Sequence, residues 1–495
     1  MKKKNIIVIG SGFAGLTSAA LMAKEGHKVT VLEKNDQAGG RARVWEKDGF
    51  MFDMGPSWYW MPEVFEKYYN LFGKTTADFY ELKRLDPSYR VYYPASEQID
   101  VPASTKELIA LFEQKEAGSG AKLERFLKSA EYKYNTAMAE YVHRISDSVT
   151  EFFDIKLLVK SFQLKIFQSL RSEVRSQFTN PALVSLLEFP VLFLGSTPDK
   201  TPAMYSMMNY ADLVLGTWYP MGGMHRIVEA MVKIAKDQGV EIVLNQEVTR
   251  IEVKRGEAKA VYTKDKVYKA DVVVSGSDYN HTEQHLLNKD SRTYDKEYWQ
   301  SRTMSPSSLL FYLGVNKELK GLLHHNLFFD ADFEQHAKEI YSEPKWPSSP
   351  LFYACVPSKT DASVAPAGME NIFLLMPLAP GIEDTEALRE EYFDKMMKRL
   401  EERTGENIRQ HLIVKRSYCI KDFEKDYHSF KGNAYGLANT LMQTAFLKPK
   451  MISPKVKNLF YTGQLTVPGP GVPPAIISGQ MVANEVSRRI EKQLI

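Results

Sequence analysis

The sequence predicts an α/β protein in which a parallel β-sheet is accompanied by a small antiparallel sheet and by an inserted α+β unit. Three observations support this prediction: a strand, glycine turn and helix at the start of the chain, alternating strands in the middle, and a second strand, glycine turn and helix at the end. Strands buried on both faces of a parallel sheet are continuously apolar, whereas half-exposed antiparallel strands alternate apolar and polar residues.

The first unit is a dinucleotide-binding pattern. A β-branched run over residues 5–9 is followed by Gly10, Gly12 and Gly15, which form G-x-G-x-x-G. These glycines permit a tight turn, close approach of the backbone to a diphosphate, and close packing of helix on strand. The next helix directs its free N–H groups and positive dipole end at the anion. Glu33 ends the second strand, where its carboxylate can accept hydrogen bonds from ribose hydroxyls, so a Rossmann-type domain is predicted.

A second glycine pair ends at Gly40 and is followed by Arg41. Nicotinamide enzymes need no such pair, but a large family of flavoproteins has one, because the diphosphate of FAD meets this second loop and its arginine. The stretch therefore favours FAD over NAD. Gly55 and Pro56 then interrupt regular structure. The aromatic run at residues 58–60 suits the wall of an apolar pocket near the cofactor and ordinary core packing equally well.

The alternating strands follow a predicted helix over residues 226–237. Residues 247–253, 259–263 and 266–268 alternate as half-exposed antiparallel strands do, and residues 270–275 form another buried strand. This pattern predicts a small sheet within the nucleotide domain. Val248 is expected to lie against the adenine.

The end of the chain carries the second strong signal. A strand over residues 458–463 ends at Gly463, and a turn rich in proline and glycine, containing Gly471 and Val472, leads into a helix. This arrangement places another helix N-terminus beside the ligand. We therefore predict a discontinuous FAD-binding domain and a substrate-binding, membrane-associating domain, the former from residues 1–75, 219–290 and 446–495, the latter from residues 76–218 and 291–445.

Composition excludes several classes of function. The 64 basic and 61 acidic residues leave a net charge of only +3, so nucleic acid is not an expected partner. The two cysteines, Cys355 and Cys419, cannot form a disulfide framework or a zinc site between them. His281 and His285 lack a third ligand, and no metal centre is predicted. No secretion signal or membrane-spanning helix is expected, which predicts a cytoplasmic protein.

One segment suggests contact with a membrane. In residues 151–171, lysine and arginine alternate with leucine and phenylalanine. A basic amphipathic helix of this kind can lie in a membrane interface, and an ordinary surface helix is the alternative.

Together these features resemble the bacterial phytoene desaturase family, the carotenoid desaturases of the FAD-dependent amine oxidase and phytoene desaturase superfamily. The matching stretches span nearly the whole chain and comprise residues 10–15 with Glu33, 39–42, 55–62, 218–223, 432–435 with 443–446, and 458–479. The chain departs from the usual family stretch G-A-G-T-H-P-G-x-G at Gln464, Leu465 and Val467. That region lies near the flavin in the family, so these residues bear on the number of desaturation steps or the preferred substrate.

The resemblance implies an FAD-dependent conversion of phytoene to lycopene, or to a partly desaturated intermediate. A hydride passes to the flavin and a proton leaves the neighbouring carbon, because no side chain can accept the hydride. The substrate would be a membrane-dissolved C40 polyene, reached from the inner face of the cell membrane by a peripherally bound enzyme. Oxygen and a quinone both remain open as the acceptor that reoxidises the flavin.

Other functions remain open from the residues. The chain could be a hydroxycarotenoid desaturase, a ketolase or an isomerase acting on another carotenoid, an amine oxidase, or a non-redox lipid escort like the GDP-dissociation inhibitors. No motif marks a catalytic acid or base. Arg171 and Asp154 are candidates only because they are charged residues within an aromatic block, and surface roles suit them better. The predicted site is therefore limited to cofactor residues.

Overall fold

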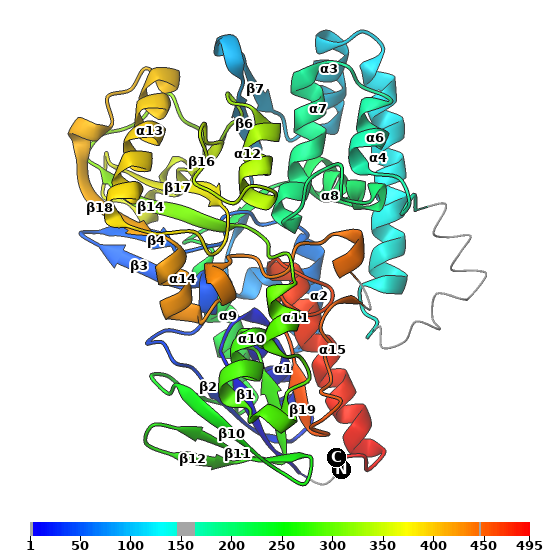
Figure 1. Cartoon of the computed structure of the whole chain (residues 1–495). Coiled ribbons are helices and arrows are strands. Elements are labelled where there is room, and N and C mark those ends of the chain that lie inside the picture. Colours follow the sequence, from blue (N-terminus) through cyan, green and yellow to red (C-terminus); the bar gives the residue numbers. More distant parts are fainter. Residues whose placement is uncertain (1–2, 146–163, 445–446) are drawn as a thin grey trace.

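A computed structural model describes residues 3–145, 164–444 and 447–495 (Figure 1). A five-stranded sheet in the lower part of Figure 1 has every neighbouring pair of strands parallel. Its strands in spatial order are β19 (Leu459–Tyr461), β13 (Val272–Ser275), β1 (Asn5–Ile9), β2 (Lys28–Leu32) and β9 (Glu241–Val243). Three distant stretches of chain therefore build this one sheet.

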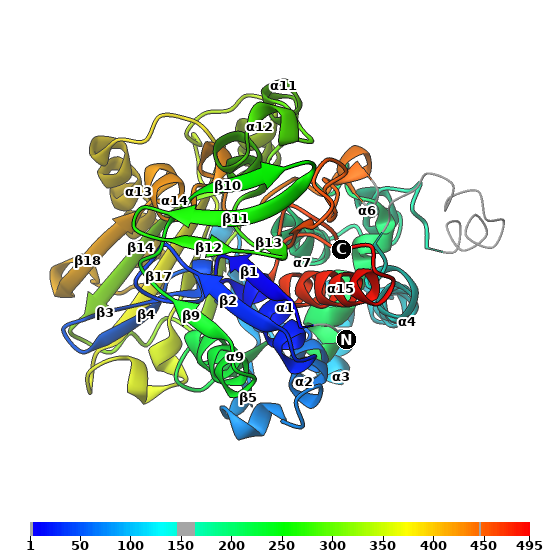
Figure 2. The same cartoon turned by 90° about the horizontal axis from the view of Figure 1, so that it is seen from below.

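Alternate residues of β1 face different layers. Ile6 and Val8 pack against α1 (Phe13–Lys24), α9 (His225–Asp237) and α15 (Val472–Glu491). Ile7 and Ile9 pack on the opposite face, against a three-stranded antiparallel sheet of β10 (Val248–Lys254), β11 (Glu257–Thr263) and β12 (Val267–Lys269). Figure 2 shows this sheet and the helices on opposite sides of β1 and β2. Each fully buried Ile or Val side chain contributes about 1.5–3 kcal/mol, which fixes the register of the strand.

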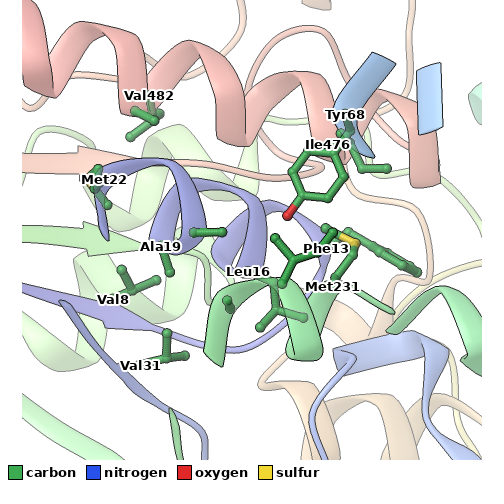
Figure 3. Packing of buried hydrophobic residues seen from close by; sticks show 14 of the residues in the cluster. Val8, Phe13, Leu16, Ala19, Met22, Val31, Tyr68, Met231, Ile476 and Val482 are labelled. Atoms are coloured by element: carbon green, nitrogen blue, oxygen red, sulfur yellow. The ribbon is translucent and has the colours of Figure 1, made fainter. Parts of the chain in front are cut away.

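Helix α1 lies at the centre of the half of the molecule that is built on the parallel sheet. Leu16 and Ala19 of α1 face Val8 and Val31 of the sheet, and α15 with Val482 covers the other side of α1 (Figure 3). A Cβ on Gly479 of α15 would lie 2.5 Å from the carbonyl oxygen of Ala14 and 2.7 Å from Cβ of Thr17. The two helices can therefore cross this closely only with glycine at this position.

A seven-stranded mixed sheet lies in the upper part of Figure 1. Its strands in spatial order are β18 (Leu412–Tyr418), β14 (Ser307–Val315), β17 (Glu370–Leu378), β16 (Phe352–Cys355), β15 (His325–Phe328), β6 (Tyr89–Tyr92) and β7 (Gln98–Val101). All its pairs are antiparallel except β15 with β6. Helix α13 (Glu386–Thr404) packs on one face of this sheet, in a core shared with β14 and β17.

The remaining elements connect and cover these layers. The helices are α2 (Pro62–Asn70), α3 (Thr105–Lys115), α4 (Ser119–Thr136), α6 (Leu170–Arg175), α7 (Pro181–Glu188), α8 (Met207–Tyr210), α10 (Tyr279–His281), α11 (Lys296–Gln300), α12 (Phe333–Tyr341) and α14 (Ile420–Tyr427). Two small antiparallel pairs join β3 (Val44–Lys47) to β4 (Phe50–Asp53) and β5 (Leu82–Arg84) to β8 (Trp218–Pro220). Helices α3, α4, α6 and α7 gather beside the seven-stranded sheet (Figure 1).

The predicted fold class is confirmed, since the parallel sheet, the small antiparallel sheet and an α+β unit are all present. The domain boundaries stay a prediction. The expected amphipathic helix over residues 151–171 lies largely outside the described residues. Its described end differs from the prediction, because residues 164–167 form turns and α6 begins only at Leu170. None of the helices in the described ranges is long and apolar enough to cross a membrane.

The crossing of α1 and α15 gives a stability prediction. Gly479→Ala should destabilise the protein by about 1–3 kcal/mol through overpacking, although alanine is intrinsically the better helix former. The exposed Asn484→Ala on the same helix should change stability by less than about 0.5 kcal/mol. Chemical denaturation of both variants measures the difference, and equal stabilities would contradict the close crossing.

Candidate functional site

A cavity of about 1050 Å³ extends from the ends of the parallel strands to the seven-stranded sheet. Its wall brings together every cofactor residue predicted from the sequence, from the two ends and the middle of the chain. These are Gly10, Gly12, Gly15, Glu33, Gly40, Arg41, Gly55, Pro56, Val248, Gly463, Gly471 and Val472. Their direct contacts with FAD stay a prediction, but their convergence meets its first geometric requirement.

Gly12 and Gly15 of the first turn are explained by different physical requirements. A Cβ on Gly15 would lie 2.1 Å from the carbonyl oxygen of Gly10, so packing of α1 on β1 excludes any side chain there. Gly12 has an ordinary φ of −70°, and a Cβ on it would meet no atom within 4 Å. Neither backbone nor packing requires glycine at position 12. Close approach of a ligand such as the FAD diphosphate accounts for it.

Two further loops meet this turn. A Cβ on Gly40 would lie 3.4 Å from Cα of Gly12, and Gly40 adopts a φ of +57°. A Cβ on Gly55 would lie 2.4 Å from the carbonyl oxygen of Arg41, so the third loop packs directly on the second. The three loops therefore lie in direct backbone contact, and together they form one wall of the cavity beside the N-terminus of α1.

Glu33 is held in a fixed orientation at the end of β2. One carboxylate oxygen accepts hydrogen bonds from the Ser11 backbone N–H at 2.9 Å and the Ser11 hydroxyl at 2.7 Å. The other accepts from the Asn35 N–H at 2.9 Å. Each carboxylate oxygen has two lone pairs, so the oxygen that accepts only from Asn35 can still accept one hydrogen bond from a ribose hydroxyl in the cavity.

Arg41 is a half-buried cation held by uncharged hydrogen-bond acceptors. Its guanidinium donates hydrogen bonds to the Ser429 hydroxyl and the Asn433 carbonyl and lies 4.9 Å from the centre of the Tyr427 ring, while Nε has no partner. Burial lowers the pKa of this group below its ordinary value. No ion pair joins Arg41 to an acid in the described part of the chain. A desolvated cation in this state fits the diphosphate of FAD.

The C-terminal turn completes this end of the cavity. The Gly463 N–H donates to the hydroxyl of Ser478, 3.0 Å away on α15. Gly471 precedes α15 at a φ of +112°, which favours glycine, and Val472 is the first helical residue. Pro473 and Pro474 carry no N–H and the Ala475 N–H is bonded to the Gly471 carbonyl, so this helix offers the cavity its positive dipole end and the Val472 N–H.

The end of the cavity lined by the three glycine loops and Glu33 is the nucleotide end. Several residues in its wall were not predicted from the sequence. The rings of His281 and His428 stack at 3.9 Å, and His428 Nε2 lies 2.7 Å from Glu247. Burial, with the neighbouring His428, lowers the pKa of His281 to about 3, so the ring is neutral. Burial raises the pKa of Asp278 to about 6. The position of Asp278 after the buried strand β13 was the available signal, because ligands bind beyond the carboxyl ends of parallel strands.

Aromatic and aliphatic side chains line the other end of the cavity. They include Trp58, Trp60, Met204, Tyr205, Phe189, Leu310, Phe329, Ile340, Tyr353, Phe373 and Leu375. The aromatic run at residues 58–60 divides between its two predicted roles. Trp58 and Trp60 line the cavity, whereas Tyr59 is fully buried in the core, where its ring stacks on Phe65 at 4.3 Å.

The charged candidates do not join the site. Arg171 forms ion pairs with Glu334 at 2.7 Å and Asp199 at 3.7 Å, and it is not among the residues lining the cavity. Asp154 lies outside the described residues. His336 does line the apolar end, but its Nε2 lies 3.0 Å from the Pro377 carbonyl and its Nδ1 accepts from the Leu351 N–H at 3.0 Å. Both nitrogens are therefore engaged, and His336 is not free to take a proton.

Comparison with known proteins identifies the family. The family described as flavin containing amine oxidoreductase matches residues 13–487. A carotenoid 3,4-desaturase of Haloarcula japonica is 40% identical over 483 residues, covering 97% of each chain. The chain belongs to the carotenoid desaturases of the flavin-containing amine oxidoreductase family. A 4,4'-diapophytoene desaturase (4,4'-diaponeurosporene-forming) of Staphylococcus aureus is 31% identical and covers 98% of this chain and 99% of that one.

Solved structures show the same fold at lower identity. An oxidoreductase from Methanosarcina mazei superposes with a TM-score of 0.64 at 18% identity, covering 97% of this carotenoid desaturase and 100% of that chain. Putrescine oxidase bound to putrescine superposes with a TM-score of 0.59 at 13% identity, covering 98% and 99%. FAD, the predicted cofactor, is confirmed by the family. A non-redox lipid escort is correspondingly disfavoured.

The two glycines of the first turn give a paired prediction. Gly12→Ala should leave the stability of the FAD-free desaturase within about 1 kcal/mol, yet raise the Kd for FAD at least about tenfold, because the methyl group enters the cavity. Gly15→Ala should destabilise the FAD-free protein by at least about 2 kcal/mol. Denaturation curves and FAD titrations separate the effects. Equal FAD affinity in Gly12→Ala and wild type would contradict the proposed path of the diphosphate.

Proposed function

We propose that this carotenoid desaturase acts on a C40 polyene, converting phytoene to lycopene or to a partly desaturated intermediate. The main support for this proposal is that one cavity joins the nucleotide end to a long apolar wall. All carboxylates among the described lining residues, Glu33, Glu247, Asp278 and Asp426, belong to the nucleotide end. A charged amine at the apolar end would lose its hydration without gaining an anionic partner there, so an uncharged hydrocarbon is the better fit.

The residues around the apolar end would position the polyene and exclude water. Trp58 stacks on His325 at 4.2 Å, and the Tyr353 hydroxyl donates to Ser57 at 3.0 Å, so the aromatic wall is fixed from behind. A rigid wall holds a flexible chain in one reactive geometry at low entropic cost. Bound FAD supplies the hydride acceptor that side chains lack.

A second candidate is 3,4-desaturation of a carotenoid that is already more unsaturated. The Haloarcula japonica relative, with 40% identity, carries that name. The unusual residues Gln464 and Leu465 support this candidate, since both line the cavity. A turn that differs from the usual family stretch beside the flavin can change which bond of the polyene is presented.

Exposed apolar residues at the cavity favour entry from a membrane. Phe167 is 67% exposed and Met442 is 71% exposed, and both belong to the cavity lining. Lys165, two residues from Phe167, has a side chain that is 43% exposed but forms an ion pair with Glu173 at 2.9 Å, so the apolar side chains are the main support for membrane contact. Exposed apolar side chains of this kind suit the interface of a bilayer. A peripheral position on the inner face of the cell membrane would deliver the polyene directly to this mouth.

Expression in a host that accumulates phytoene tests the function. Wild type should form lycopene or an intermediate with fewer new double bonds. Ala337→Trp, on the cavity side of α12, should reduce conversion at least about tenfold while retaining FAD, because the indole occupies the polyene space. Lys338→Trp, on the exposed side, serves as the control. Pigment extracts and flavin content provide the measurements.

Two results would decide against phytoene. Unchanged phytoene beside FAD-loaded wild type, with conversion of a more unsaturated carotenoid in the same assay, would favour the 3,4-desaturase. Full activity of FAD-loaded Ala337→Trp would show that the polyene does not occupy this end of the cavity.

The membrane contact has its own test. Phe167→Glu combined with Met442→Glu should weaken binding to vesicles containing anionic lipid at least about tenfold, since two charges replace apolar side chains at the interface. Ile413→Glu, at an exposed apolar residue of β18, should leave binding unchanged. Co-sedimentation measures all variants. Equal vesicle binding by the double variant and the wild type would contradict a membrane contact at Phe167 and Met442.

A further inference from the structure

A buried cluster of potential metal ligands lies behind the aromatic wall of the cavity. His324, His325 and Cys355 are each at most 5% exposed, and one ligand atom from each side chain lies within 4.8 Å of the other two. His325 on β15 and Cys355 on β16 are register partners, so strand pairing places them opposite each other. His324 immediately precedes β15, and the centre of its ring lies 4.4 Å from the centre of the His325 ring.

Each of the two imidazoles has one nitrogen beside a hydroxyl group and the other without a partner. Nδ1 of His324 lies 2.7 Å from the Thr360 hydroxyl, and Nδ1 of His325 lies 2.6 Å from the Tyr353 hydroxyl. In both rings Nε2 is buried and has no hydrogen-bond partner. A histidine whose first nitrogen is held by an outer partner presents the other as a ligand. Two orphaned buried nitrogens in adjacent residues call for a partner.

The surroundings suit a cation. Of the three residues, Cys355 also lines a small cavity of about 20 Å³, large enough for one water molecule, together with Asp53, Ser57 and Tyr219. The carboxylate of Asp53 is close enough to Cys355, and that of Asp361 to His324, to act on them electrostatically. Burial raises the pKa of the Cys355 thiol in the protein alone, and a bound divalent cation reverses this preference.

We propose that His324, His325 and Cys355 bind one divalent transition-metal ion, with zinc the best match. Two nitrogens, one sulfur and a water molecule would complete a four-coordinate site. Tetrahedral zinc needs ligand atoms about 3.5 Å apart, so the side chains would move together by about 1 Å on binding.

Such an ion would have a structural role. It would join β15 to β16 directly behind Trp58, whose ring stacks on His325 with an interplanar angle of 7°. The Tyr353 hydroxyl, next to His325, also reaches Ser57. The metal would thus fix residues 57–58 in the wall of the cavity. This structural role does not depend on which carotenoid the enzyme takes.

Metal content of the FAD-loaded enzyme, purified from zinc-supplemented cells, tests the site. About one zinc ion per chain is expected, with X-ray absorption at the zinc edge reporting one sulfur and two imidazole nitrogens. Cys355→Ser should lower the zinc content at least about tenfold. Cys419→Ser should retain it, because Cys419 is an equally buried thiol outside the cluster.

The proposal is overturned if zinc stays below about 0.1 per chain, including after incubation with zinc sulfate, which would leave a buried water as the partner of the imidazoles. Zinc retained equally by Cys355→Ser and Cys419→Ser would also overturn it. Should Cys355→Ser fail to fold, His324→Gln provides the same comparison. X-ray absorption at the zinc edge can be measured on the wild type alone, and a spectrum without a coordinated sulfur would exclude the site.

Discussion

The close approach of three backbone segments around the nucleotide end of the cavity is the constraint on which the rest of this structure depends. Gly15 lets α1 begin against the turn at Gly10, Gly40 brings the second loop to Gly12, and Gly55 lets the third loop rest on Arg41. Any side chain at Gly15 or Gly55 would separate these segments. With the segments together, the N-terminus of α1 and the Arg41 guanidinium border the space that FAD requires, and α15 closes it from the far end of the chain.

Much of this half of the molecule could be predicted from the sequence, because its signals are local. A β-branched strand, a glycine spacing and a terminal acid lie within a few tens of residues, and each has one main physical reason. The wall residues His281 and His428 could not be found in this way, since they are brought together from different elements. The expected helix ending at Arg171 was wrong at its described end, where Ser169 forms a bridge with Pro202 instead of continuing a helix.

The apolar half was less predictable because its chemistry arises from packing between distant strands. The sequence alone could not separate Trp58 and Trp60, which line the cavity, from Tyr59, which belongs to the core. Similarly, His325 and Cys355 are 30 positions apart and become neighbours only through pairing of β15 with β16. The same pairing supports Trp58 from behind. The polyene wall and the proposed metal site therefore share one face of the β15–β16 pair in the interior of the sheet, and the rigidity of one contributes to the geometry of the other.

We expect a polyene at the apolar end to deliver its electrons to FAD at the nucleotide end of the same cavity. Anaerobic mixing of the FAD-loaded enzyme with vesicles containing phytoene measures this transfer directly, without an added acceptor. The visible flavin absorbance should be lost as about one new double bond forms per flavin, and the absorbance should return when an acceptor is admitted. Flavin absorbance unchanged by phytoene and by more unsaturated carotenoids, but lost on addition of an amine such as putrescine, would contradict this expectation.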